Sequence, residues 1–304
     1  MTSSRSARRE PLVTAPRTPG PLTPGPLTPE PLTPGVDTPP LSERDFLLLR
    51  ELISREAGLH LTSAKKALVV ARLSRRLRAL GLRSFGVYYE LVNGPDGAAE
   101  RVHMLDAIST NETSFFRERQ HFEFLEREVL PRWCAEAAAK RRSRRVRAWS
   151  AGWHIDILGT DLSTRVLDRA RAGCWPIEKA EAIPGEYRRA FMLRGVRERE
   201  GTMKVGPELR AVVRFAQLNL HAENYSVPRN CDLVFCRNVL IYFDQPTRSR
   251  ITRRLIGHLQ PGGYLFLGHA ETLHTAGGNE LKTVMPTVYA RPSADGGDAP
   301  GRKA

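Results

Sequence analysis

Apolar residues recur every three or four positions after residue 41, and this spacing predicts helices. Ser42 and the acids that follow it precede an apolar run over residues 46–53, an order that predicts a capped first helix. A second helix is predicted from Thr62, with Gly81 as its stop. One side of it carries Val70, Leu73, Leu77 and Leu80, and the other carries the basic residues Lys65, Arg72, Arg75 and Arg76. The basic side is either a solvated surface or a docking face for an acidic partner.

Further helices are predicted over residues 85–92 and 118–130, the second ending near Pro131. Beyond residue 145 the pattern changes to short apolar runs that alternate with helical segments. The predicted strands are residues 146–150, 155–160, 212–218, 232–236, 264–268 and 284–290, and the helices among them are residues 163–171 and 245–259. This alternation predicts an α/β fold of the doubly wound type, with a mostly parallel sheet. The Pro261-Gly262-Gly263 sequence predicts a tight turn.

These patterns divide the chain into five predicted segments. They are a disordered Thr-Pro repeat tail (1–40), a helical domain with a basic face (41–110), a connecting helix and hinge (111–145), an α/β domain with a small β insertion at 188–207 (146–290), and a disordered tail (291–304). Proline recurs in the first tail at a fixed phase, which favours an extended chain that packs against nothing. That tail is either a linker or a ligand for a proline-reading module.

Composition narrows the classes of partner. The 304 residues are 41% hydrophobic and carry a net charge of +14, so the chain can bury a sizeable core and should meet an acidic partner. No run approaches the ~20 apolar residues of a membrane span, and the start lacks a secretory core; we expect a cytoplasmic protein without membrane insertion. The four cysteines show no metal-ligand spacing, which predicts reduced thiols and no metal site.

Polar residues follow two of the predicted strands, at the edge where doubly wound sheets bind ligands. Asp161 ends one strand and could accept hydrogen bonds from both hydroxyls of a ribose; equally, it could cap the helix that begins near Ser163. Arg237 and Asn238 end another, and Tyr242 is close to the same rim. The segment NETSFFRE at 111–118 is a third marker, although by itself it would be a capped helix start.

Taken together, these motifs resemble the chemotaxis receptor methyltransferase family, CheR, which esterifies glutamate side chains on bacterial chemoreceptors. The resemblance runs from about residue 42 to residue 291 and is strongest at NETSFFRE, GTDLS, RFAQLNL and the string DLVFCRNVLIYFDQPTRSRITRRLIGHLQPGGYLFLGHAE. It implies a class I, Rossmann-like methyltransferase fold with an N-terminal helical domain and a β insertion. The implied methyl donor is S-adenosyl-L-methionine, which becomes S-adenosyl-L-homocysteine, without a metal.

The resemblance also implies roles for individual residues. The implied cofactor-binding residues are Asn111, Thr113, Arg117, Asp161, Asn219, Leu220, Arg237 and Asn238. Arg117 and Tyr242 are implied as catalytic, the first near the incoming carboxylate and the second beside the methyl group. Lys65, Arg72, Arg75 and Arg76 would bind the acidic helical methylation region of chemoreceptor cytoplasmic domains. We expect a monomer that binds no specific nucleic acid.

The sequence departs from the family in one place. After Gly152 it lacks the glycine-rich, acidic cofactor loop of the form GCSTGEEPYS and the helix that follows it. The remaining link is too short for a usual parallel crossover, so it predicts a hairpin or a broken strand. Two alternatives stay open: a catalytically impaired relative that binds receptors without methylating them, and a nucleic-acid methyltransferase. Against the second, the residues between Asn238 and Tyr242 lack the paired prolines of an NPPY motif.

Overall fold

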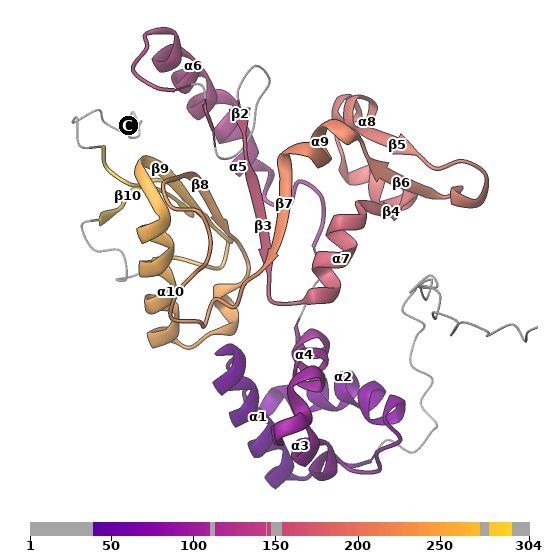
Figure 1. The fold of residues 1–304 in the computed structure, drawn as a ribbon. Helices are drawn as coiled ribbons and strands as arrows, with labels where there is room; N and C mark the ends of the chain where they lie inside the picture. The colour runs from indigo at the N-terminus through magenta and orange to yellow at the C-terminus, as the bar shows by residue number, and fades with distance from the viewer. Residues whose placement is uncertain (1–38, 110–112, 144, 147–153, 274–279, 294–304) are drawn as a thin grey trace, which may run out of the picture. The chain divides into compact units, whose positions relative to one another are not determined.

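A computed structural model describes residues 39–109, 113–143, 145–146, 154–273 and 280–293 (Figure 1). The chain divides into one unit over Met1–Asp37 and another over Thr38–Ala304, and all that follows concerns the second. The Thr-Pro repeat and the end of the C-terminal tail lie outside the described residues, so their predicted disorder stays a prediction, as do the five segment boundaries.

The N-terminal part of this unit is all helical. Its elements are α1 (Glu43–Ala57), η1 (Ser63–Lys65), α2 (Lys66–Ala79), α3 (Phe85–Asn93), η2 (Pro95–Gly97) and α4 (Ala98–Ile108). The cap predicted for the first helix is confirmed, because Oγ of Ser42 accepts a hydrogen bond of 3.0 Å from the backbone N–H of Asp45. Apolar side chains from all four α-helices, including Phe46, Leu73 and Met104, form one buried core. Helix α4 has no predicted counterpart, since two of its four buried positions are the acids Glu100 and Asp106.

The predicted division of α2 into an apolar and a basic side is wrong in part. Leu80 is 39% exposed, and Val69 is fully buried in its place. Arg72 and Arg76 turn inward to α4: Nη1 of Arg72 donates to the carbonyl oxygens of Ala107, Ile108 and Ser109, and Nε of Arg76 donates to Glu100 at 2.8 Å. Arg75 is exposed. The four basic residues therefore form no single outward face, and a receptor-binding role for them stays a prediction.

Glu100 is the buried end of this ion pair. Burial alone would raise the pKa of the Glu100 carboxyl, but hydrogen bonds from Arg76 and from the Tyr88 hydroxyl, at 2.9 Å, outweigh it and lower the pKa. The carboxylate is thus ionised at neutral pH and depends on Arg76 for charge compensation.

Replacing Arg76 by alanine is expected to destabilise the protein by about 3 kcal/mol, because Glu100 is left buried and uncompensated. Arg75→Ala, one position away on the exposed side, is the matched control and should change the free energy of unfolding by less than ~0.5 kcal/mol. Urea unfolding followed by circular dichroism measures both. Equal stability of the two variants would contradict the structural role given to Arg76.

The sequence predicts that the connecting helix ends near Pro131, but in the structure the helix continues past this residue. Helix α5 (Arg119–Phe124) continues through a π-helical turn, η3 (Leu125–Val129), into α6 (Leu130–Ala138). Proline lacks an N–H and its ring crowds the carbonyl one turn earlier. The wider π turn just before Pro131 accommodates both, and the buried Val129 and Trp133 hold the helix against the sheet core.

The α/β part is built on three parallel ladders. These join β1 (Arg145–Val146) to β2 (His154–Ile155), β3 (Ile157–Asp161) to β7 (Val213–Gln217), and β8 (Cys231–Cys236) to β9 (Leu259–Leu267). β11 (Val288–Ala290) and β10 (Lys282–Met285) extend the last ladder antiparallel, in the order β10-β11-β9-β8. The associated helical elements are α7 (Thr164–Ala172), α9 (Pro207–Val212), η6 (Leu240–Tyr242) and α10 (Gln245–His258). The predicted α/β class with mostly parallel pairing is confirmed.

One local prediction about the strands is wrong, and one of two alternatives for a second is excluded. The residues Pro261–Gly263 belong to β9, where the register against β8 shifts between Cys231 and Leu233, so they form an irregularity within a strand and no terminal turn. The short link after β1 makes no hairpin, because β1 and β2 pair in parallel over two residues. Residues 147–153, where the cofactor loop is missing from the sequence, lie outside the described residues.

A small antiparallel sheet is inserted between α7 and α9. It contains β4 (Cys174–Pro176), β5 (Met192–Arg194) and β6 (Thr202–Val205) in the order β4-β6-β5, with η4 (Ile177–Ala182), α8 (Gly185–Phe191) and η5 (Arg197–Arg199) between the strands (Figure 1). It begins before the predicted range of 188–207, because β4 pairs with β6. Within the described ranges, no helix has both the length and the apolar character needed to cross a membrane.

Candidate functional site

Two adjoining cavities lie beside the carboxyl ends of β3, β7 and β8. The larger has a volume of about 700 Å³ and runs between β3 and β8; the smaller, of about 180 Å³, also receives residues from the helical part. Their walls share Thr160, Asp161, Leu218, Leu220, Asn238, Val239 and Tyr242. The volume of the larger cavity is typical of a small-molecule site.

Asp161 is the last residue of β3 and borders both cavities. Its Oδ1 accepts a hydrogen bond of 2.8 Å from the backbone N–H of Ser163. The helix that follows is capped by Ser163, whose Oγ accepts from Val166 at 3.2 Å, so the alternative that Asp161 is the N-cap is wrong. Burial raises the pKa of the Asp161 carboxyl, and nearby Asp106 adds to the effect. This half-buried acceptor suits a ligand that brings hydroxyl donors.

The rim beyond β8 is shaped by Glu271, a buried carboxylate with 4% of its surface exposed. Its Oε2 accepts from the backbone N–H of Gly268 and Asn238 at 2.6 and 2.8 Å, and its Oε1 accepts from Leu240 and Ile241 at 2.6 and 3.3 Å. Asn238 has a φ of 58°, a left-handed conformation that these bonds stabilise. A Cβ at Gly268 would lie 2.6 Å from the Asn238 nitrogen, so only glycine allows this close approach.

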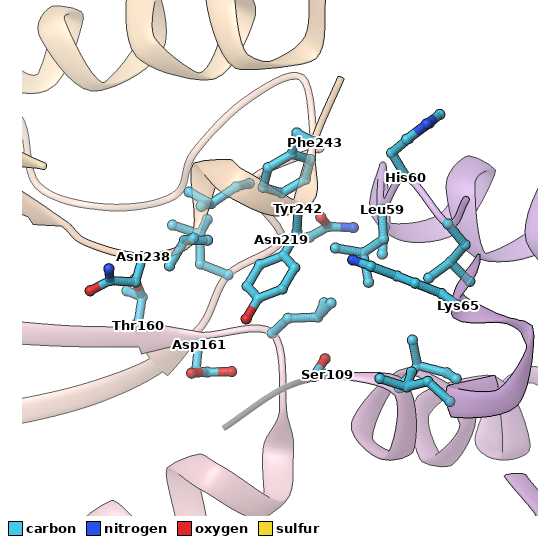
Figure 2. Close-up of a pocket in the computed structure, with 18 residues that line it drawn as sticks. Leu59, His60, Lys65, Ser109, Thr160, Asp161, Asn219, Asn238, Tyr242 and Phe243 are labelled. Atoms are coloured by element: carbon cyan, nitrogen blue, oxygen red, sulfur yellow. The ribbon is translucent and has the colours of Figure 1, made fainter. Parts of the chain in front are cut away.

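Tyr242 and Lys65 face each other across the smaller cavity (Figure 2). The Lys65 ammonium lies 5.5 Å from the centroid of the Tyr242 ring, and the Tyr242 hydroxyl points toward the side where Asp161 lies. The backbone carbonyl of Tyr242 accepts a hydrogen bond of 2.8 Å from His60, which ties this wall to the turn after α1. Lys65 is thus a cavity residue rather than part of an outward basic face.

Asn219 and Leu220 follow β7 and line the smaller cavity, as Figure 2 shows for Asn219. Nδ2 of Asn219 donates to the backbone carbonyl of Glu56 at 2.7 Å, and its Oδ1 accepts from His221 at 2.9 Å. Both polar ends of this side chain therefore hold the walls together, which leaves mainly its flat faces for a ligand.

The segment NETSFFRE divides its side chains between two parts of the fold. Phe115 meets the Trp175 ring edge-on at 5.2 Å, and Phe116 stacks on Tyr187 at 5.6 Å, so both rings pack on the β insertion. Arg117 lines the larger cavity with Thr113. Asn111 lies outside the described residues.

Of the residues implied by resemblance, the larger cavity brings together Thr113, Arg117, Asp161, Leu220, Arg237, Asn238 and Tyr242. Asn219 and Lys65 line only the smaller cavity, and Arg72, Arg75 and Arg76 line neither. Among the described residues, no three His, Cys, Asp or Glu side chains gather as a metal ion would need.

Comparison with known proteins decides the family. Residues 44–109 match the model for the CheR methyltransferase all-alpha domain, and residues 151–289 match that for the CheR methyltransferase SAM binding domain. The chain is 36% identical over 273 residues to chemotaxis protein methyltransferase 2 of Pseudomonas aeruginosa, covering 82% of this chain and 93% of that protein. The chain belongs to the CheR methyltransferase family. It is also 37% identical over 253 residues to the Escherichia coli chemotaxis protein methyltransferase, covering 76% of this chain and 85% of that protein.

This CheR methyltransferase therefore has the class I methyltransferase fold that its motifs imply, joined to the family's all-alpha domain. The matched domain binds S-adenosyl-L-methionine, and the cavities fit its nucleoside part: Asp161 offers a carboxylate for hydroxyls, and Leu59, Leu218 and Leu220 offer apolar surface for a base. Arg117 adds a cation to the wall of the larger cavity.

Three residues that shape this CheR site carry no role in the sequence interpretation: Glu271, His60 and Glu118. Glu271 and Glu118 stand within motifs of the family, but a sequence alone does not separate a ligand-binding carboxylate from one that accepts backbone hydrogen bonds. His60 acts through its backbone N–H, for which no side-chain pattern exists.

Proposed function

We propose that this protein transfers the methyl group of S-adenosyl-L-methionine to glutamate side chains of chemoreceptors and so forms glutamate methyl esters. The observation that carries the proposal is one continuous cleft that Arg117, Asp161 and Tyr242 all line. The relatives are named as chemotaxis protein methyltransferases, which supports methyl transfer within chemotaxis.

When bound, S-adenosyl-L-methionine supplies an electrophilic methyl group on a sulfonium sulfur. Asp161 would accept hydrogen bonds from the ribose hydroxyls, while Asn219 and Leu220 would border the adenine. Thr113, Arg237 and Asn238 would complete the wall. These assignments rest on matched motifs and on the side chains that share the two cavities.

The protein's own contribution to the chemistry is positioning. A glutamate side chain of the substrate is already ionised at pH 7, because its reference pKa is about 4.3, so no general base is required. Arg117 would orient the incoming carboxylate, and Tyr242 would pack beside the transferred methyl group and exclude water. Positioning of this kind is worth up to ~7–11 kcal/mol in oriented intramolecular reactions.

The acidic helical methylation region of a chemoreceptor is the proposed partner, met in the cytoplasm by a monomer of this chain. Of the three arginines implied by the resemblance, Arg75 is the exposed one that can contact such a surface directly, whereas Arg72 and Arg76 contribute their charge from within the fold. A triple charge reversal at these arginines would disrupt the Arg76–Glu100 pair, so Arg75→Glu is the informative variant.

The test is transfer of a labelled methyl group from S-adenosyl-L-methionine to a purified chemoreceptor cytoplasmic fragment, with release of the label by mild base as the mark of an ester. Arg117→Ala should lower kcat/KM by ~100-fold or more, because the carboxylate is no longer aimed. Arg119→Ala is the matched control, since Arg119 lies two residues away with a side chain 74% exposed. Equal loss in both variants, or label resistant to base, would contradict the proposal.

A second candidate, a relative that binds receptors without methylating them, is favoured by the missing glycine-rich segment after Gly152. It predicts no heat on titration with millimolar S-adenosyl-L-methionine, together with retention of the receptor fragment that weakens in Arg75→Glu. Saturable heat with ester formation would reject this candidate. If the titration gives no heat and the receptor fragment is not retained, both candidate functions are rejected.

A further inference from the structure

A cluster of buried polar side chains stands behind Arg117, and of its members only Arg237 has a role above, in the proposed cofactor wall. It consists of Glu118, His121, Arg237 and Thr287, which come from the loop before α5, from α5, from the position just after β8 and from the turn between β10 and β11. The side chain of Glu118 is 9% exposed, that of Arg237 14%, and that of His121 is fully buried.

Glu118 is the centre of this cluster. Its Oε1 accepts a hydrogen bond of 3.0 Å from the backbone N–H of His269. Its Oε2 lies 3.3 Å from Nε of Arg237 and 3.4 Å from Nδ1 of His121. Within the described residues these three atoms are buried without a hydrogen bond, so they are held together by charge and packing rather than by ideal bond geometry.

His121 packs against Glu118 from the other side. Nε2 of its ring lies 2.9 Å from Oγ1 of Thr287, whose hydroxyl donates to the carbonyl of Pro286 at 2.6 Å. Because that hydroxyl hydrogen is already used, Nε2 must carry the proton and donate to Thr287. In the neutral ring Nδ1 then has a lone pair facing Glu118, and only the protonated ring can hydrogen-bond to the carboxylate.

Backbone strain marks the same place. Four non-glycine residues of this region have left-handed backbones: Phe116 at φ 53°, Glu118 at 57°, Asn238 at 58° and Thr287 at 65°. Each such conformation costs on the order of 1–3 kcal/mol and persists where the surroundings over-determine it, typically at functional sites. Phe116 and Glu118 flank Arg117, so the direction of the Arg117 side chain depends on both.

We propose that Glu118 is a positioning residue for methyl transfer: it fixes the guanidinium of Arg237, which hydrogen-bonds the backbone carbonyl of Arg117 and thereby sets the direction of the Arg117 side chain. The inference rests on the proposed function, in which Arg117 orients the substrate carboxylate. Arg237 also packs over the Phe122 ring, 5.6 Å from its centroid, so two contacts besides the carboxylate restrict it.

The electrostatics agree with this arrangement. Burial lowers the pKa of the Arg237 guanidinium, and Glu118 is the first charged group that opposes this change. Burial also lowers the pKa of His121, with a further lowering by Arg237 and an opposing contribution from Glu118. Removing the Glu118 charge should therefore lower the pKa of His121 further.

Glu118→Gln, which keeps the shape and the acceptor for His269, tests the inference in the full chain. We expect kcat for methylation of the receptor fragment to fall ~100-fold, the effect of a misplaced reacting group, while KM for S-adenosyl-L-methionine changes less than ~3-fold. Glu118→Asp, which restores the charge, should recover part of kcat. Glu123→Gln, on the exposed side of α5, is the matched control and should leave kcat unchanged.

A purely structural role predicts another pattern, a lower unfolding free energy with wild-type kcat in the folded fraction, and that result overturns the inference. If Glu118→Gln does not fold, Arg237→Lys replaces it, since lysine keeps the charge but cannot hold both Glu118 and the Arg117 carbonyl; wild-type kcat in this variant also overturns the inference.

Failure of the proposed function is recognised separately. If the wild type forms no ester, the proposal for methyl transfer fails. The contact between Glu118 and His121 is then tested by the pKa of His121, measured by NMR with ring-labelled histidine. A lower pKa of His121 in Glu118→Gln supports the cluster as described, and an unchanged pKa overturns it.

Discussion

Asp161→Asn is expected to weaken the binding of S-adenosyl-L-methionine strongly while leaving the free protein at least as stable as the wild type. The carboxylate would accept both ribose hydroxyls, and hydrogen bonds to a charged group contribute about 1.5–3 kcal/mol each, so the affinity should fall ~100-fold or more. An asparagine oxygen can still accept the bond of 2.8 Å from Ser163, so the local fold is kept. Titration calorimetry with S-adenosyl-L-homocysteine measures the loss.

The stability half of this prediction follows from the direction of the pKa shift. Burial raises the pKa of Asp161 above its unfolded value, so the folded state favours the protonated acid, and that stabilisation is lost as pH rises through the folded pKa. At neutral pH the buried carboxylate therefore lowers the free energy of unfolding, and the uncharged asparagine removes this destabilisation. Asp168→Asn, on the exposed face of α7, should change neither binding nor stability. A destabilised Asp161→Asn protein would mean that Asp161 supports the fold rather than a ligand.

Glu271→Ala is expected to have the largest effect on stability among single substitutions at the site. It leaves four backbone N–H groups without their acceptor, and each buried donor left unsatisfied costs about 1–3 kcal/mol. The free energy of unfolding should fall by about 4 kcal/mol or more, and cofactor binding should be lost because Asn238 is no longer held in its left-handed conformation.

Urea unfolding measures this change, and Glu223→Ala, an exposed glutamate, is the control, expected to lie within ~0.5 kcal/mol of the wild type. Glu271→Gln should also be destabilised, because the NH2 group of glutamine is a donor and would face backbone N–H groups that are donors too. A Glu271→Ala protein with wild-type stability would show that water replaces the carboxylate at no cost.

Local sequence rules predicted those elements whose determinants are local. Ser42 and Gly81 mark helix ends through their own side chain or backbone freedom, and both act as expected in the structure. Pro131 failed as a stop because a π turn, a property of the whole helix, absorbs the missing N–H. Helix α4 was missed because Glu100 is buried by an ion pair with Arg76, which no periodicity of apolar residues can reveal.

The site was predictable where a residue acts through its own side chain. Asp161, Asn238 and Tyr242 end strands or follow them, and the structure brings them to one cavity wall. Glu118 and Glu271 were not predictable, because both act on backbone groups or buried charges far away in the sequence. Resemblance to a family transfers positions, but the contacts that hold those positions appear only in three dimensions.

The pairing of His121 with Thr287 joins residues 166 positions apart, and Glu271 binds the backbone of a loop some thirty residues before it. During synthesis the helical part and the first strands emerge from the ribosome well before either partner exists. A stalled or truncated chain that ends before Thr287 lacks the partner of His121, so this wall of the cleft stays incomplete. Under the proposed function, we therefore expect fragments that end before Thr287 to transfer no methyl group.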